Sequence, residues 1–438
     1  MSIVLLPIIF FNFVPDSVSH IDNRKLAENP FTTEGDLTEN IENYINDRIG
    51  FRDSLISAYT ILNDKLFDKM VHPSYTYGKD GYVFGSKLTS TNEFGDYFIV
   101  FADMIEAIQE YCSSRNVPFL FVFNPAKTAI HQDKLPNGVN FNREWVNQFF
   151  SELDKRGINY LDNTETLMEL SASGIEGFNQ KYDANHWNDV GAFYGTQKML
   201  ERLKEEIPSV HINDMSEFTV SQILRTSLLV SNFPINEYVP LIELNVQYED
   251  LSNQYSSVIK LDSSYRGFGY YINSERLNEG TPKLLSFQGS YMNAYGYKFM
   301  INSFGEYIYV HDYQNIIDFP YYFNIFQPDC VIFEVAENTF SNEYFNYNMM
   351  KEINYNPSLS SLSDSDYTLV NIADEDISIE KNGTLTCITW KTNSSYSYVW
   401  LELDKTYDMK SIEGGYQVTI ETNDYENTDS NIKILVME

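Results

Sequence analysis

The clearest candidate for chemistry in this sequence is an acid–base pair, Asp183 and His186, three residues apart. At this spacing the carboxylate can fold back to accept the Nδ1 proton, which fixes the imidazole tautomer and leaves Nε2 free as a base. A helix pattern starts near Val190, so we expect the pair in the loop before a helix. The alternative is a surface loop with an incidental histidine, and for this motif alone that alternative is favoured.

A candidate nucleophile, Ser290, follows an apolar strand pattern and the dipeptide Gln288-Gly289, and it precedes a helix pattern. This order would expose a hydroxyl at the carboxyl edge of a parallel sheet, where open α/β folds bind ligands. The first backbone N–H groups of the helix would then be available to an oxyanion. The alternative is that Ser290 only caps the helix.

Two further polar groups follow predicted strands. Asn338 comes after the strand pattern Cys330–Val335, and its amide could donate to a developing oxyanion. An ordinary turn is the alternative. His311-Asp312 follows the strand pattern Tyr307–Val310 and is a rival base, with loop filler as the favoured alternative.

The elements that would position these residues alternate between strands and helices, which predicts an α/β fold with a mainly parallel sheet and helices on both faces. A hairpin is expected over Tyr75–Phe84, because Asp80-Gly81 favours a tight turn. The stretch Asn213–Gly280 gives no clear pattern, and we expect that it could contain extra strands. We expect strands at Pro118–Phe123, Ile158–Leu161 and Lys283–Phe287, and helices near Asp96–Ser114, Trp145–Lys155, Val190–Glu205, Asn293–Phe304 and Asn315–Phe326.

The composition changes after about Asn356, where short strand patterns alternate with polar turns. This is typical of a small all-β sandwich. Trp390 and Trp400 lie in these strands and could stack on sugars, although core packing is favoured for each of them.

Composition narrows the classes of function. The chain has 438 residues, and 30 Lys and Arg against 62 Asp and Glu give a net charge of −32, which disfavours nucleic acid and anionic lipid as partners. The 30 Phe and 33 Tyr exclude a wholly disordered chain. The three Cys lie far apart, and no metal-binding, P-loop or dinucleotide motif occurs, so we expect no metal and no cofactor.

The N-terminal run Ile3–Val14 is apolar, yet it is shorter than the roughly 20 residues that span a bilayer. We interpret it as the outer part of an anchor or export helix, with a buried terminal segment as the alternative. An extracellular or cell-surface location is therefore expected, with this segment as a candidate tether.

Taken together, the D-x-x-H pair, the Gly-Ser after a strand and the Asn after a P-D-x-V strand resemble the blocks of SGNH (GDSL-type) hydrolases. Here the D-x-x-H block precedes the Ser block, a circularly permuted order that resembles the AlgX/AlgJ and DHHW branch. Residues 22–30, 44–53, 78–84 and 124–127 match further landmarks of that branch in order. The chain departs from the pattern of this branch at three places. Gln288 precedes Gly289-Ser290, and two residues separate Asp183 from His186. Glu337-Asn338 stands where the branch often has Glu-Arg.

The resemblance implies an SGNH-like α/β domain over residues 31–350, an N-terminal arm over 1–30 and a β-sandwich, a candidate carbohydrate-binding module, over 356–438. It implies a triad of Ser290, His186 and Asp183, with the Ser290 N–H and Asn338 as oxyanion donors. Candidate substrate-binding residues are Asn124, Lys127, Trp187, Tyr291, Trp390 and Trp400.

The implied function is O-acetyl transfer to a polysaccharide, or removal of acetyl from one, through an acyl-enzyme. The acyl donor could come from a membrane-bound O-acyltransferase. Two alternatives stay open: an inactive glycan-binding scaffold, and a structural subunit that docks on such an acyltransferase.

Overall fold

The computed structural model describes residues 7–14, 17–19, 21, 25–33, 35–86, 88, 93–229, 233–428 and 431–438. Residues 3–6 of the N-terminal apolar run and landmark residues 22–24 lie outside these ranges. None of the described helices combines the length and the apolar character needed to cross a membrane.

A seven-stranded sheet forms the centre of the molecule, in the order β4-β3-β11-β9-β10-β8-β7. The strands from β4 to β10 in this order run parallel, and β8 and β7 add an antiparallel edge. The predicted α/β class with a mainly parallel sheet is therefore confirmed. The bounds are β3 Phe119–Asn124, β4 Tyr160–Asp162, β7 Glu249–Asp250, β8 Phe268–Ile272, β9 Lys283–Gln288, β10 Glu306–His311 and β11 Cys330–Ala336.

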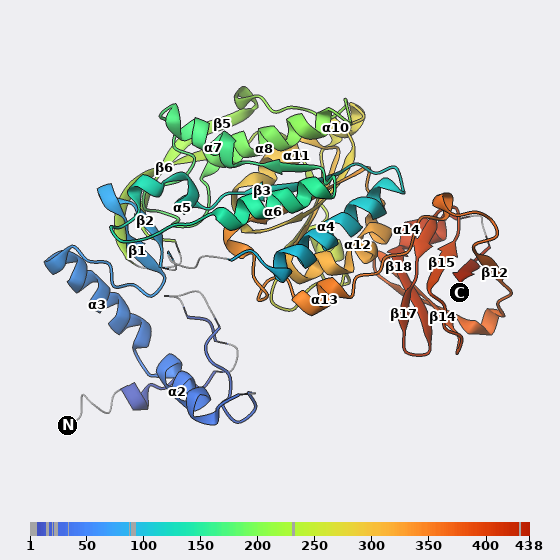
Figure 1. Cartoon of the computed structure of the whole chain (residues 1–438), viewed down its shortest axis with the longest axis horizontal. Coiled ribbons are helices and arrows are strands. Elements are labelled where there is room, and N and C mark those ends of the chain that lie inside the picture. Colours follow the sequence, from blue (N-terminus) through green and yellow to red (C-terminus); the bar gives the residue numbers. More distant parts are fainter. Residues whose placement is uncertain are drawn as a thin grey trace.

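The parallel strands are apolar on both faces, so each face needs a cover of helices. In β3, Phe121 and Phe123 face one core while Leu120 and Val122 face the other. The first core is closed by α4 Asp96–Ser113, α6 Glu144–Lys155, α12 Phe319–Phe326 and α13 Tyr347–Lys351. The second is closed by α7 Thr164–Ala172, α8 Asp189–Lys204 and α11 Tyr297–Ser303 (Figure 1).

Two hairpins flank the sheet. The predicted one is present as β1 Tyr75–Tyr77 and β2 Val83–Gly85. The stretch that gave no clear pattern contains a long hairpin, β5 Phe218–Ser227 and β6 Pro234–Leu244. Its side chains are mostly exposed, which explains why no strong apolar alternation marks it in the sequence.

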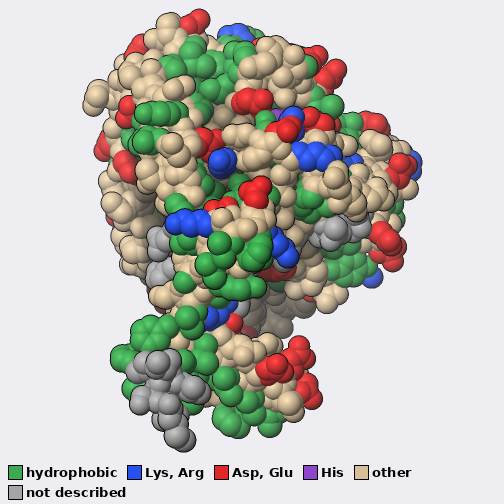
Figure 2. Space-filling view, turned by 90° about the vertical axis from the view of Figure 1, so that its left-hand side faces the viewer, with side chains coloured by type: hydrophobic (Ala, Val, Ile, Leu, Met, Phe, Trp, Pro, Cys, Tyr) green, Lys and Arg blue, Asp and Glu red, His purple; other side chains and the backbone are tan. Residues whose placement is uncertain are grey.

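The helices α2 Leu37–Arg48 and α3 Arg52–Phe67 extend away from the sheet as a helical arm, which follows the segment 1–30 in sequence (Figure 1). Buried Arg48 ties residues 12, 14 and 27 to α2, because its guanidinium donates to the carbonyl oxygens of Asn12, Val14 and Ala27. Hydrophobic side chains gather on this arm (Figure 2). Those most exposed on α3 are Leu55, Tyr59, Leu62, Leu66 and Phe67.

The C-terminal strands form two four-stranded antiparallel sheets, ordered β12-β19-β15-β16 and β13-β14-β18-β17. They enclose a core of their own, as predicted for an all-β sandwich. The strands are β12 Thr368–Val370, β13 Ile377–Asn382, β14 Leu385–Lys391, β15 Tyr398–Glu402, β16 Thr406–Asp408, β17 Lys410–Ile412, β18 Gly415–Glu421 and β19 Lys433–Met437.

The two tail tryptophans are not available to a ligand, which corrects their assignment as candidate substrate-binding residues. Trp390 is 4% exposed and packs in the sandwich core beside Tyr416. Trp400 is 0% exposed, and its indole N–H donates to the carbonyl oxygen of Pro357. Trp390 thus fills the sandwich core, and Trp400 joins β15 to the segment before the sandwich, as large aromatic side chains with a polar group commonly do.

A buried ion pair joins the sandwich to the α/β domain. The Arg115 guanidinium, on the turn after α4, lies 3.0 Å from the Asp408 carboxylate in β16. Tyr111 donates to the same carboxylate, and Asn324 of α12 exchanges two hydrogen bonds with the backbone of Asp408. Asp408 therefore holds three parts of the chain together.

We expect Asp408→Ala to destabilise the protein by about 3 kcal/mol, because it leaves the largely buried Arg115 guanidinium without a charged partner. Chemical denaturation followed by circular dichroism measures this change. Glu426→Ala is the matched control: Glu426 pairs with Lys381 at the surface, so its loss should cost less than about 1 kcal/mol. Equal losses in the two variants would contradict the prediction.

Candidate active site

The register of the parallel strands sets the position of the candidate nucleophile. Gln288 at the end of β9 pairs with His311 of β10, while Phe287 pairs with Phe333 of β11. Asn124 of β3 pairs with Ala336 of β11. Chain segments that are distant in sequence thus meet at one carboxyl edge, with the strand that leads to Ser290 between β10 and β11.

The structure brings Ser290, His186 and Asp183 together. The Oγ of Ser290 lies 2.8 Å from Nε2 of His186, although 104 residues separate them in sequence. The Nδ1 of His186 lies 2.9 Å from each carboxylate oxygen of Asp183. This is the order of contacts that a nucleophile, a base and an orienting carboxylate require.

Asp183 is buried and held by several donors. Its carboxylate accepts the backbone N–H groups of His186 and Asn185 and the hydroxyl of Tyr295. Its backbone has φ +38°, a region that Asp tolerates better than most residues. Tyr295 was missed in the sequence, where it reads as one of many tyrosines.

The pKa values of the pair move in the direction that favours an ion pair. Burial alone would raise the pKa of Asp183, but the imidazole of His186 and the hydrogen bonds outweigh burial and lower it. Burial alone would lower the pKa of His186, but the Asp183 carboxylate outweighs burial and raises it. The geometry therefore stabilises the imidazolium that forms when His186 takes a proton.

Three elements hold the loop that carries this pair. Lys127 donates from Nζ to the carbonyl oxygens of Val83 and Gln180, which joins the loop to β2. The Glu237 carboxylate in β6 accepts the backbone N–H groups of residues 180, 181 and 182 at 2.6–3.0 Å. Gly85 leaves room for Asn185, because a Cβ there would lie 2.6 Å from the amide oxygen.

Four other residues predicted to bind substrate are buried parts of this support, which corrects their assignment. The indole of Trp187 donates to the carbonyl oxygen of Tyr291, and the Tyr291 hydroxyl donates to that of Asn185. Lys127 is 1% exposed, and the Asn124 amide donates to the carboxylate of Glu334. Burial shows that these side chains position the loops instead of contacting a ligand.

Ser290 begins a helical segment, so its N–H is one of the groups that have no partner within the helix. The segment continues as a π-helical turn, Met292–Gly296, before α11. Such turns often occur at functional sites. Asn338 is exposed in a 3₁₀ turn after β11, and no described contact joins it to Ser290. Its role as an oxyanion donor stays a prediction.

Gln288, one of the residues that depart from the family pattern, is fully buried, and both polar atoms of its amide are hydrogen-bonded. Its amide oxygen accepts from Ser286 and Tyr307, and its Nε2 donates to Asn293 in the π-helical turn. It therefore fixes the start of the nucleophile helix against β9 and β10.

Two buried carboxyl groups lie beside the nucleophile loop. Glu334 of β11 was missed in the sequence because it stands inside an apolar strand. Asp312 follows β10 and is 0% exposed, with His311 Nδ1 at 3.0 Å from it. Neither His311 nor Asp312 has a described contact with Ser290.

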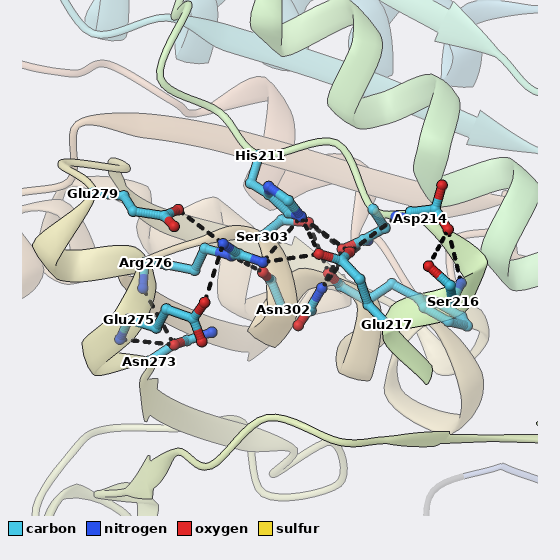
Figure 3. Close-up of polar contacts among 12 residues, drawn as sticks. His211, Asp214, Ser216, Glu217, Asn273, Glu275, Arg276, Glu279, Asn302 and Ser303 are labelled. Atoms are coloured by element: carbon cyan, nitrogen blue, oxygen red, sulfur yellow. Dashed lines mark hydrogen bonds and ion pairs between the residues drawn. The ribbon is translucent and has the colours of Figure 1, made fainter. Parts of the chain in front are cut away.

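A second polar cluster lies away from these residues, between the turn before β5 and helices α10 Ser274–Asn278 and α11 (Figure 3). The Arg276 guanidinium bonds to Glu217, Glu279 and the carbonyl oxygen of Asn302. His211 also contacts Glu217. These groups satisfy one another, so we interpret the cluster as a structural tie.

Among the described residues, no group of His, Cys, Asp and Glu side chains has the arrangement of a metal site.

Residues 76–250 match the family model of the SGNH hydrolase-like domain of the acetyltransferase AlgX. The match contains Asp183 and His186, while Ser290 lies outside it. It confirms the resemblance inferred from the sequence motifs. A comparison with curated proteins gave no match.

Among solved structures, Bacillus cereus PatB1 aligns at a TM-score of 0.47 and 15% identity, over 62% of this chain and 97% of that one. A DHHW family protein from Eubacterium siraeum aligns at 0.44 and 15% identity, over 65% and 97%. The O-acetyltransferase domain of Pseudomonas putida AlgJ aligns at 0.41 and 13% identity, over 67% and 97%.

We expect Glu237→Ala to loosen the loop of the acid–base pair, because three backbone N–H groups lose a charged acceptor. The cost of opening this loop should fall by about 2 kcal/mol, so amide exchange at residues 180–182 should speed up roughly 30-fold. Glu243→Ala, at an exposed position of the same strand, should leave that exchange unchanged. Unchanged exchange in Glu237→Ala would show that the carboxylate does not hold the loop.

Proposed function

Because the chain carries an SGNH hydrolase-like domain of the AlgX kind, we propose that it is an O-acetyltransferase or acetylesterase that acts through an acyl-enzyme on Ser290. The single observation that supports this most strongly is the unbroken series of contacts from Ser290 Oγ to His186 and on to Asp183.

In the proposed first step, Ser290 Oγ attacks the carbonyl carbon of an acyl donor while His186 Nε2 takes the hydroxyl proton. The carbonyl oxygen becomes an oxyanion, which the Ser290 N–H at the helix start would stabilise in this proposal. The bond to the leaving group then breaks, and His186 returns the proton to that group. Asp183 holds the imidazole in the correct tautomer throughout.

In the proposed second step, a hydroxyl group attacks the acyl-enzyme while His186 takes its proton. The ester bond to Ser290 breaks, and the proton returns to Ser290 Oγ. A sugar hydroxyl as attacker gives transfer, and water gives hydrolysis. Both outcomes use the same intermediate, so the acceptor decides between them.

We propose a polysaccharide as the acceptor, in line with the acetyltransferase family that residues 76–250 match. The net charge of −32 favours a neutral glycan over a strongly acidic one. We further propose that the protein acts outside the cell or at its surface, and that a membrane-bound O-acyltransferase supplies the acyl group.

Incubation of the pure protein with p-nitrophenyl acetate, with and without a glycan acceptor, tests the proposal. We expect release of p-nitrophenol and an acetyl group on Ser290, detected by mass spectrometry of the quenched reaction. Ser290→Ala should abolish both, and Ser303→Ala, which changes a buried serine at the end of α11, should keep the acetylation. A wild-type rate in Ser290→Ala would refute the nucleophile, and no Ser290-dependent reaction at all would favour an inactive scaffold.

We expect the rate of acylation to rise with pH through the pKa of His186, since only the neutral imidazole accepts a proton. Burial alone would lower this pKa, but the Asp183 carboxylate raises it above the ordinary value of histidine. Asp183→Asn should therefore move the acid limb to lower pH and reduce kcat by about 10³–10⁴, because the tautomer is no longer held.

The pH dependence of kcat/KM measures this shift, because it reports groups of the free enzyme. Asp214→Asn, which changes an exposed capping residue, should not move the acid limb. An acid limb that stays in place or moves to higher pH in Asp183→Asn would contradict the expected effect of the carboxylate.

A further inference from the structure

Four aromatic rings gather at the carboxyl edge of the sheet, next to the strand that leads to the candidate nucleophile. They belong to Tyr265 before β8, to His311 and Tyr313 at the end of β10, and to Tyr344 before α13. Tyr313 is at the centre of the group. Its ring centroid lies 4.6 Å from that of Tyr265, 4.5 Å from that of His311 and 4.4 Å from that of Tyr344. We refer to these four rings as the aromatic platform.

The platform is joined directly to the nucleophile loop. His311 pairs with Gln288 in the parallel register of β10 and β9. The backbone N–H of Asp312, the next residue, donates to the carbonyl oxygen of Gln288 at 3.1 Å. Ser290 follows two residues after Gln288, so the platform begins beside the turn that carries the nucleophile.

Asn293 brings a polar group to the platform from the other side. It lies in the π-helical turn that follows Ser290. A Cβ built on Gly267 would lie 3.4 Å from Cδ2 of His311 and 3.5 Å from Nδ2 of Asn293. The amide oxygen of Asn293 accepts from Gln288, but among the described contacts its Nδ2 has no acceptor. A hydrogen-bond donor therefore stands beside the rings.

The outer rings keep contact with solvent. Tyr265, His311 and Tyr344 are partly exposed, whereas the central Tyr313 is 5% exposed. No described hydrogen bond uses the hydroxyl of Tyr265 or of Tyr344. Burial raises the pKa of Tyr265 to about 12 and also raises that of Tyr344, so both hydroxyls stay protonated and can donate.

The backbone holds the platform in a costly conformation. Tyr313 has φ +43°, a left-handed conformation that is rare for a bulky residue. Strain of this kind clusters at sites that clamp a ligand. The amide of Gln314 donates to the carbonyl oxygen of Tyr344, and Nδ1 of His311 lies 3.0 Å from the Asp312 carboxylate. These contacts fix the loop after β10 and the loop of Tyr344 relative to each other.

We propose that the aromatic platform binds a pyranose ring of the glycan acceptor, with Nδ2 of Asn293 and the hydroxyls of Tyr265 and Tyr344 as donors to the sugar oxygens. The C–H groups on one face of a pyranose are apolar and pack on aromatic rings, while its hydroxyl groups need polar partners. The proposal deepens the proposed function and rests on it for the transfer step, but binding of the sugar does not require the nucleophile to react.

Burial elsewhere in the molecule supports this choice of site. The aromatic residues first expected to stack on sugars are buried in the C-terminal sandwich or against it, and the other two tryptophans are buried as well. The four are Trp145, Trp187, Trp390 and Trp400. The platform, by contrast, combines partly exposed rings and unused donors beside Ser290. A sugar held there would have its hydroxyl groups near the position of the acyl-enzyme.

Isothermal titration calorimetry of the full chain with Ser290→Ala measures this binding without reaction. The probes are β-1,4-linked hexamers of glucose, mannose and N-acetylglucosamine. At least one hexamer should bind, and a further Tyr265→Ala or Tyr344→Ala should weaken that binding by about tenfold, because a ring that packs on the sugar is lost. Tyr344→Phe keeps the ring, so its affinity should stay within about threefold of the parent.

Tyr248→Ala is the matched control. Tyr248 is a partly exposed tyrosine that stacks on Tyr271, and Tyr271 pairs with Tyr307 near the start of β10, at the opposite end of that strand from His311. This variant should bind the hexamer as the parent does. Urea unfolding establishes that each variant is folded before titration, and either alanine variant alone suffices if the other does not fold.

Equal affinity in the parent, Tyr265→Ala and Tyr344→Ala would overturn the platform, and so would failure of all three hexamers to bind the parent. A loss in Tyr344→Phe as large as that in Tyr344→Ala would overturn packing on the ring. Binding that depends on Tyr344, together with no Ser290-dependent release of p-nitrophenol by the wild-type chain, would support the platform and refute only the proposed activity.

Discussion

The parallel pairing of β3, β11, β9 and β10 is the constraint on which the rest of the site depends. Because the strands are in parallel register, four chain segments end at one edge, and the polar residues after each strand meet there. The candidate base reaches this edge from outside the sheet, through the loop before α8. Any slip of β9 by one residue would turn Ser290 away from His186 and would bury the wrong face of the strand.

Holding a loop at that edge requires the burial of polar groups, and each buried group needs a partner. Lys127 and Glu237 satisfy backbone groups of the base loop, Glu334 satisfies the Gly289 N–H of the nucleophile loop, and Gln288 bonds the side chain of Asn293 in the turn that follows. The residues nearest the reacting atoms therefore have a supporting layer that fixes their rotamers. Such support is what keeps a Ser–His hydrogen bond at 2.8 Å in a loop-built site.

Some of this could be predicted from the sequence and some could not. Strands β3 and β11 are apolar apart from Asn124 and Glu334, and Asp183, His186 and Ser290 stand in short motifs, so apolar pattern and residue spacing were sufficient to predict them. Extra strands were expected over Asn213–Gly280, but the β5–β6 hairpin was not placed within this stretch because its side chains are largely exposed. Glu334 was missed because its neighbours in β11 are apolar, and Trp187 and Tyr291 were misassigned because sequence does not reveal burial.

The departure from the family pattern at Gln288 is explained in the same way, because a buried polar side chain needs hydrogen-bond partners. Gln288 supplies three hydrogen bonds, to β9, β10 and the π-helical turn, so it fixes the nucleophile helix by side-chain contacts. Gly289 then leaves the space between Asp312 and Glu334 free of a side chain, and its N–H is used by Glu334. That amide is already used, so the Ser290 N–H stays the backbone donor that we propose for the oxyanion. The chemistry available at Ser290 is thus set by how the two residues before it are bonded.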